Sequence, residues 1–225
     1  MQKIFVILGY GVPKNIMTDD NYGCYLGFTF NKIYDEVNGE QAKILFCGGK
    51  TDCHSPYKRT EAEEMFKLFV SFAKRKFIKA KTKDWQYIKE KKSVCRLENF
   101  LYTYDYLVKH KIKSAEVVVF CEYTRRKRAG ELIKRIFKGY KVKLEPVDFD
   151  LSPNRYLDKD FISKKENRQQ AWALRALADK NELKKFIQNH KDKLKFLREN
   201  NYINNPEVVE EWWKINNKLQ KPNNK

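Results

Sequence analysis

The chain of 225 residues is 42% hydrophobic and 14% aromatic, which is enough apolar material to bury one full core and to carry an appendage. Its longest apolar runs, at 4–8 and 117–121, are far shorter than the roughly 18 residues that a membrane span needs, and no cleavable leader pattern follows Met1. We therefore expect no membrane segment, no membrane partner and no secretion signal.

The five cysteines are odd in number, and two of them, Cys47 and Cys121, stand inside apolar runs where a thiol behaves as a small hydrophobe. This pattern predicts reduced thiols and a cytoplasmic protein. Cys53 and His54 follow Cys47, but no second pair stands at finger-like spacing, so no metal site is expected.

The formal charge of +18 would ordinarily suggest nucleic acid or an anionic membrane surface as a partner. The excess is mostly lysine, accompanied by many asparagines and spread over the whole chain. A dedicated binding face concentrates its charge, often in arginine. Nucleic acid therefore remains the alternative partner, and an anionic small molecule is the leading one.

Strand-like and helix-like stretches alternate through the first two thirds of the chain, a pattern typical of a parallel sheet with right-handed crossovers. The run 4–8 is apolar on both faces, which predicts a strand in the interior of the sheet. The sequence thus predicts an α/β, Rossmann-like three-layer domain over residues 1–150. The expected strands are 4–9, 42–48, 85–88, 115–121 and 141–147, and the expected helices are 22–37, 60–76, 97–109 and 128–137.

The pattern changes after Pro153, where three consecutive helices are expected at 166–178, 182–198 and 207–219. These form a C-terminal all-helical extension over residues 151–225. Apolar residues recur there at helical spacing, while the lysines are interspersed with Glu, Asp and Asn, which indicates solvated faces around an apolar interior.

Glycines follow the first two predicted strands: Gly9 and Gly11 after the first, and Gly48 and Gly49, with Lys50, after the second. Glycine lets the backbone turn sharply and can bring N–H groups close to an anionic ligand. The alternative interpretation is that these glycines serve chain reversal alone.

Three further motifs follow in order: RTEAEEM at 59–65, SVCRLEN at 93–99 and RRKRA at 125–129. In order and spacing the set resembles the YdcF-like family, a domain-of-unknown-function group that also contains SanA-like and ElyC-like envelope proteins, over roughly residues 3–147. The resemblance implies a ligand site and, because relatives are associated with envelope biogenesis, a role in envelope-related metabolism. The matching positions are Gly48, Gly49, Glu61, Ala62, Glu63, Glu98, Asn99, Arg128 and Ala129, with Thr60 in place of the family's serine.

The sequence departs from the family at three places: Cys95-Arg96 replaces Asn-Thr, Arg125 replaces a histidine, and Tyr10 replaces a frequent glycine. Without that histidine, an acid/base mechanism cannot be carried over. Arg125 is instead a permanent cation that can fork onto a phosphate or carboxylate. These positions favour the holding of an anion over the moving of a proton.

Glu61 and Glu98 allow two interpretations, because acidic residues in the first turn of a helix also favour the positive end of its dipole. As site residues they would face Arg125 and Arg128, where one could accept hydrogen bonds from a ribose or sugar hydroxyl or act as a base. Asn99 could orient a ligand or Glu98. No motif of a known catalytic class is present, so the sequence does not decide whether the protein is an enzyme.

The leading interpretation is a YdcF-like protein that binds a nucleotide-like or phosphorylated small molecule at the carboxyl ends of the strands. The alternative is a basic nucleic-acid or protein-binding module that acts through the helical extension. No cofactor is identified, although a nucleotide-like ligand is one candidate. The predicted ligand-binding residues are Gly9, Gly11, Gly48, Gly49, Lys50, Thr60, Glu61, Glu98, Asn99, Arg125 and Arg128.

Overall fold

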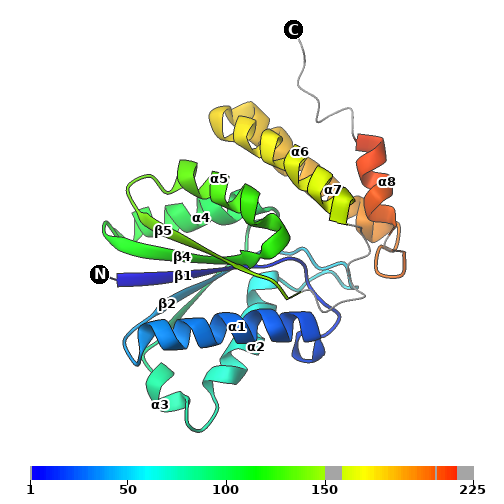
Figure 1. The fold of residues 1–225 in the computed structure, drawn as a ribbon. Helices are drawn as coiled ribbons and strands as arrows, with labels where there is room; N and C mark the ends of the chain where they lie inside the picture. The colour runs from blue at the N-terminus through cyan, green and yellow to red at the C-terminus, as the bar shows by residue number, and fades with distance from the viewer. Residues whose placement is uncertain (1, 150–158, 206, 217–225) are drawn as a thin grey trace. The chain divides into compact units, whose positions relative to one another are not determined.

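The computed structural model describes residues 2–149, 159–205 and 207–216 (Figure 1). The chain divides into two compact units. The described residues of 1–52 and 57–151 form the first unit, and those of 53–56 and 152–225 form the second. The predicted domain boundary at residue 150 lies outside the described residues. The assignment of 53–56 to the second unit was not expected from the sequence.

The first unit contains a five-stranded, all-parallel sheet with the order β3-β2-β1-β4-β5. β1 pairs with both β2 and β4, in parallel, and the residues from Ile4 to Leu8 are at most 1% exposed. This confirms the predicted α/β class and the interior position of the first strand. The strands are β1 (Gln2–Leu8), β2 (Lys43–Cys47), β3 (Gln86–Glu90), β4 (Ala115–Glu122) and β5 (Lys141–Val147).

Helices cover both faces of this sheet, α1 and α2 on one face and α4 and α5 on the other (Figure 1). The three-layer Rossmann-like arrangement is therefore present. Three short elements were not predicted from the sequence, η1 (Ile16–Thr18), α3 (Lys79–Thr82) and the turn η2 (Tyr123–Arg125). The longer helices are α1 (Asp20–Val37), α2 (Glu61–Ala73), α4 (Arg96–Lys109) and α5 (Arg126–Ile136), the last preceded by η2.

Aromatic side chains fill the layer between the sheet and the α1–α2 pair. The Phe69 ring lies 5.1 Å from that of Phe30 and 5.3 Å from that of Phe46, measured between centroids. All three side chains are at most 2% exposed. Burial of such rings stabilises the fold by about 1.5–3 kcal/mol each, so this packing holds α2, and with it the loop that precedes α2, against the sheet.

The second unit contains α6 (Lys159–Ala178), α7 (Lys180–Glu199) and α8 (Val208–Ile215), which confirms the predicted helical extension. The expected continuation of the last helix to residue 219 lies outside the described residues. Trp172 packs edge-to-face on Phe186 at 5.1 Å between centroids. A separate cluster contains Leu197, Val208, Val209, Trp212 and Trp213, with Cys53 packed against it.

Candidate functional site

The carboxyl ends of β1 and β4 mark the place where the strand order reverses, because β2 lies on one side of β1 and β4 on the other. Ligands of doubly wound sheets bind at such a switch point. The hydroxyl of Tyr25, from α1, lies 2.9 Å from the carbonyl oxygen of Leu8 and 3.1 Å from that of Phe120. Tyr25 thus bridges the ends of the two strands, and a ligand at the switch point would have to lie beyond Leu8.

The loop after β1 is held by an aromatic stack. The Tyr10 ring stacks on Tyr22 with centroids 4.1 Å apart, and the Tyr22 hydroxyl accepts from the backbone N–H of Tyr10 at 3.2 Å and donates to the carbonyl oxygen of Gly11. Phe149 also packs on the Tyr10 ring, with the two centroids 4.9 Å apart. Tyr10 therefore serves as a packing residue in this loop. Burial raises the pKa of both tyrosines, so both stay neutral.

The loop after β2 uses its amide groups within the protein. Gly48 N–H donates to the carbonyl oxygen of Glu90 at 3.0 Å, and Gly49 N–H donates to that of Ser93 at 2.8 Å. Gly9 N–H likewise donates to the carbonyl oxygen of Cys47 at 3.2 Å. The expectation that these glycines turn N–H groups toward an anion is therefore wrong for all three, because backbone carbonyls already occupy the donors.

The glycines are required for another reason. A side chain at Gly49 would overlap the carbonyl oxygen of Ser93, and a side chain at Gly9 or Gly48 would overlap Glu61. Gly48 also has φ of +150°, and Gly11 has φ of +136° with open space around it. Glycine at 9 and 48 thus makes room for a carboxyl group, and glycine at 49 lets two loops touch.

Glu61 is the first residue of α2, and its side chain is buried against the two loops, with 7% of the residue exposed. The Thr51 hydroxyl donates a 2.6 Å hydrogen bond to its Oε1. Burial raises the pKa of Glu61, while the bond from Thr51 and the charges of Arg125 and Arg96 oppose that rise. Glu61 can therefore hold a proton more readily than an exposed glutamate, or accept a hydrogen bond from a ligand hydroxyl.

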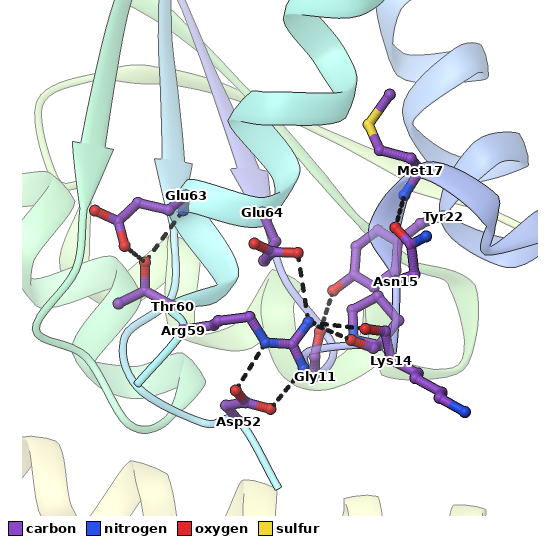
Figure 2. A network of polar contacts seen from close by, with 11 residues as sticks. Gly11, Lys14, Asn15, Met17, Tyr22, Asp52, Arg59, Thr60, Glu63 and Glu64 are labelled. Atoms are coloured by element: carbon purple, nitrogen blue, oxygen red, sulfur yellow. Dashed lines mark hydrogen bonds and ion pairs between the residues drawn. The ribbon is translucent and has the colours of Figure 1, made fainter. Parts of the chain in front are cut away.

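Thr60 is the N-cap of α2, and its hydroxyl is used there. Its Oγ1 accepts from the backbone N–H of Glu63 at 3.2 Å and donates to Glu63 Oε2 at 2.9 Å (Figure 2). Lys91 reaches the same carboxylate at 2.8 Å. The side chain of Thr60, which the sequence predicted as ligand-binding, therefore caps α2.

Arg59 ties the loop after β1 to the loop after β2 (Figure 2). Its guanidinium forks onto Asp52, which is fully buried, at 2.9 and 3.0 Å. The same group donates to the carbonyl oxygens of Pro13 at 2.9 Å and Lys14 at 3.1 Å. Sequence reasoning missed this pair because a separation of seven residues across a loop carries no recognisable signal.

The start of α4 lacks a side-chain oxygen cap, because Cys95 stands at the N-cap position. Glu98 instead accepts the backbone N–H of Val94 at 2.8 Å and lies 3.3 Å from the Tyr102 hydroxyl. Burial raises the pKa of Cys95 to about 12, against the charge of Arg128. Cys95 is therefore a thiol at neutral pH and not a nucleophilic thiolate.

Asn99, also predicted as a site residue, lies in the first turn of α4 and is 4% exposed. Its backbone N–H donates to the carbonyl oxygen of Cys95 at 3.1 Å, and its own carbonyl oxygen accepts from the Thr103 hydroxyl at 2.7 Å. Asn99 thus lies beside Glu98 at the edge where the other predicted residues stand.

Three arginines stand at the same edge. Arg96 and Arg128, in the first turns of α4 and α5, are 8% and 7% exposed. Arg125, in η2, pairs with Glu122 at 3.2 Å, and Glu122 also accepts from the backbone N–H of Thr124 at 3.0 Å. Glu61 lies within the electrostatic reach of Arg125 and Arg96, and Cys95 within that of Arg128.

The eleven predicted residues all lie in the loops that follow β1, β2 and β4, or in the first turns of α2, α4 and α5. Arg96, in the first turn of α4, and Glu122, the last residue of β4, stand at the same edge and were not predicted. Lys50 is exposed on the loop after β2. Within the part of the chain that the structure describes, no group of three or more His, Cys, Asp or Glu residues could hold a metal ion.

Comparison with known proteins gave no relatives. No family model matches the chain, and neither a curated protein nor a solved structure is similar to it at a significant level. Among the described residues, no helix is both long and apolar enough to cross a bilayer.

Proposed function

We propose that this protein binds a small phosphorylated molecule, of which a nucleotide-like ligand is the leading candidate, at the carboxyl edge of its sheet. The observation that carries the proposal is that three arginines, two of them buried, stand at the edge of the sheet where Glu61 and Cys95 lie. The charges of Arg125 and Arg96 reach Glu61, and that of Arg128 reaches Cys95. A guanidinium stays charged at any physiological pH, and its planar fork matches the oxygens of a phosphate.

The carboxylates at this edge already have partners of their own. Glu122 is paired with Arg125, Glu98 accepts from the backbone at its own helix start, and Glu90 accepts from the backbone N–H groups of Lys92 and Ser93. Burial raises the pKa of Glu61, which reduces the cost of its neutral form. In this proposal the guanidinium groups of Arg96 and Arg128 are the cations that a phosphate would contact.

The helix ends support the same class of ligand. α2, α4 and α5 have 13, 14 and 11 residues, and all begin at this edge, so the positive ends of their dipoles lie there. α2 is capped by Thr60, whereas neither α4 nor α5 has a side-chain cap. We therefore assign the phosphate group to the starts of α4 and α5, where Arg96 and Arg128 lie.

In this proposal Glu61 recognises the part of the ligand that carries hydroxyl groups. A buried carboxyl beside a phosphate-binding cation can accept a hydrogen bond from a ribose or sugar hydroxyl, as an acidic residue does in dinucleotide-binding sheets. Glu61 could also take a proton from a bound ligand, which would make the protein an enzyme. With Arg125 in place of a histidine, ligand binding has the stronger support.

The wider setting of this proposal is membership of the YdcF-like family and a cytoplasmic role in envelope-related metabolism. Family membership is supported by the position of the motifs that carry the resemblance, because they all lie at one edge of one sheet. These motifs include Gly48-Gly49, Glu61, Glu98 and Arg128. None of the five cysteines, all of which lie among the described residues, forms a disulfide, as suits a reducing compartment.

The experiment has two steps. Native mass spectrometry of freshly purified protein would first reveal a co-purified ligand. Isothermal titration with ADP and with inorganic phosphate would then compare wild type with Arg125→Gln, Arg128→Gln and Arg135→Gln. Arg135 is exposed near the other end of α5, so its variant matches the charge change of Arg128→Gln away from the site.

We expect Arg125→Gln and Arg128→Gln to weaken the binding of ADP at least tenfold and Arg135→Gln to leave it unchanged. Circular dichroism shows whether each variant is folded. Equal affinities of the folded variants for ADP would contradict the proposal, as would wild-type protein that carries no ligand and binds neither probe.

The alternative function, a nucleic-acid module built on the helical extension, has less support. Lysines of α7 and α8 form ion pairs along their own helices, such as Lys185 with Glu182 at 3.1 Å and Lys214 with Glu210 at 3.7 Å. Titration of labelled DNA and RNA across a salt series decides between the two. Nanomolar binding at physiological salt, with a log–log slope of several times −0.9, would favour the alternative.

A further inference from the structure

A compact group of cations lies between α2 and β3, on residues 74–83. All six basic side chains in this segment are exposed, and we refer to residues 74–83 as the basic tip. The side chains are those of Lys74, Arg75, Lys76, Lys79, Lys81 and Lys83.

None of these six cations forms an ion pair within the part of the chain that the structure describes. Lysines elsewhere in the same unit are paired: Lys91 with Glu63 at 2.8 Å, and Lys141 with Glu116 at 2.9 Å. The basic tip therefore presents six cations that are unpaired within the described residues, with one exposed carboxylate, that of Asp84, directly after them in sequence.

An exposed aromatic ring stands in the middle of the basic tip. Phe77 is 86% exposed, more than any other large hydrophobic side chain among the described residues. The ammonium of Lys76 lies 5.8 Å from the centre of its ring. A phenyl ring held in water costs free energy that contact with an apolar phase would recover.

The backbone of the basic tip is well anchored, so the exposure of Phe77 does not come from a loose loop. Ile78 packs against the aromatic core, and the Thr82 hydroxyl donates to the carbonyl oxygens of Ala73 and Ile78, both at 3.3 Å. The Trp85 side chain, just beyond, is buried. The fold thus holds one aromatic ring outward among six cations.

The basic tip lies at the amino-terminal edge of the sheet, opposite the candidate ligand site. α2 begins at the carboxyl edge with Glu61 and ends at Ala73, and β3 begins at Gln86, so the connection between them lies at the far edge (Figure 1). A partner on the basic tip would leave the carboxyl edge open.

We propose that the basic tip binds the surface of a bilayer that contains anionic phospholipid, with Phe77 inserted at the headgroup level. Each Lys or Arg beside an anionic bilayer strengthens binding by about fivefold, and an aromatic ring between them adds apolar contact. Single-stranded nucleic acid stacks its bases on aromatic rings along a basic groove, and a lone outward ring among cations fits a flat, soft surface better. Such contact needs no spanning helix and departs from the expectation of no membrane partner.

The test is flotation of the full-length protein with vesicles of phosphatidylcholine alone or mixed with phosphatidylglycerol. The variants are Phe77→Ala and the triple variant K74Q/K76Q/K79Q. Their matched controls are Phe28→Ala, because Phe28 is 51% exposed on α1, and K109Q/K111Q/K113Q, because these lysines are exposed at the end of α4 and on the connection to β4.

We expect wild-type protein to bind the anionic vesicles at least tenfold more strongly than the neutral ones, and added salt to weaken that binding. Phe77→Ala should weaken it several-fold and K74Q/K76Q/K79Q by roughly 100-fold, since three cations are removed. The control variants should float like wild type. Equal losses in both triple variants would overturn the proposal. So would tight binding of single-stranded RNA by protein that does not float with anionic vesicles.

Discussion

The carboxyl side chain of Glu61 occupies the space beside Gly48 that any side chain at position 48 would need. The two residues belong to different elements, since Gly48 follows β2 and Glu61 begins α2. The backbone N–H of Ala62 also donates to the carbonyl oxygen of Gly48 at 3.0 Å. The first turn of α2 thus packs directly against the end of β2, with the buried carboxyl group of Glu61 between them.

Gly48→Ala should therefore be strongly destabilising. The substitution places a Cβ against Glu61 at a φ of +150°, which L side chains rarely adopt, so we expect a loss of about 1–3 kcal/mol in the free energy of unfolding. Gly27→Ala is the matched control, because Gly27 lies inside α1 with nothing within 4 Å of a new Cβ. That variant should gain about 0.5–1 kcal/mol from helix propensity.

Urea denaturation of both alanine variants and of the double variant Gly48→Ala/Glu61→Ala measures these effects. If the alanine at position 48 destabilises the protein through contact with Glu61, it should cost less stability when Glu61 is also replaced by alanine. A Gly48→Ala protein as stable as wild type would show that the close approach is not required.

Glu61→Gln should change how stability depends on pH. Burial raises the pKa of Glu61 in the folded protein above the ordinary value of 4.5, so the folded chain holds this proton more tightly than the unfolded chain does. Wild type should therefore lose stability relative to Glu61→Gln as pH rises through 4.5 and above. Below about pH 4 Glu61 is largely protonated in both the folded and the unfolded chain, so the difference in stability should no longer change with pH.

Thermal unfolding of the two proteins between pH 3.5 and 8 tests this sign. Glu63→Gln is a useful control, because Lys91 and Thr60 lower the pKa of Glu63 and the dependence should have the opposite sign. A wild type that gains stability over Glu61→Gln with rising pH would mean that the nearby arginines outweigh burial.

Arg59→Ala should destabilise the first unit by about 3 kcal/mol. The change removes two hydrogen bonds from the buried carboxylate of Asp52 and the donors to the carbonyl oxygens of Pro13 and Lys14. Arg59→Lys keeps the charge but loses the planar fork, so it should recover less than half of that loss. Guanidinium denaturation of both variants measures these losses. If Arg59→Lys is as stable as wild type, the positive charge of Arg59 is sufficient and its planar fork is not needed.

Tyr10→Phe should leave stability unchanged or raise it by up to about 1 kcal/mol. Within the described residues the Tyr10 hydroxyl is buried and has no hydrogen-bond partner, while the stack of its ring on Tyr22 does not need the hydroxyl. Tyr10→Ala is the contrasting variant and should cost about 3 kcal/mol because it empties the stack. A marked loss in Tyr10→Phe would show that the hydroxyl has a partner in solution, such as a bound ligand.

The sequence by itself determined the order and type of the main elements. The run 4–8 is apolar at every position, and only a strand covered on both faces buries such a run, so the central place of β1 could be predicted. The candidate site could be located for a similar reason. Loops that follow parallel strands must emerge at one edge of the sheet, so Gly9, Gly48 and Arg125 could be placed together before any geometry was known.

Only the tertiary structure decided what the groups at that edge do. The amides of Gly9, Gly48 and Gly49 turned out to donate to carbonyl oxygens of other strands and loops, and hydrogen bonds between residues distant in sequence leave no local pattern. The same holds for the pair of Arg59 with Asp52. The raised pKa of Glu61 depends on how much water the packed loops exclude, and that property belongs to the folded chain and not to any motif.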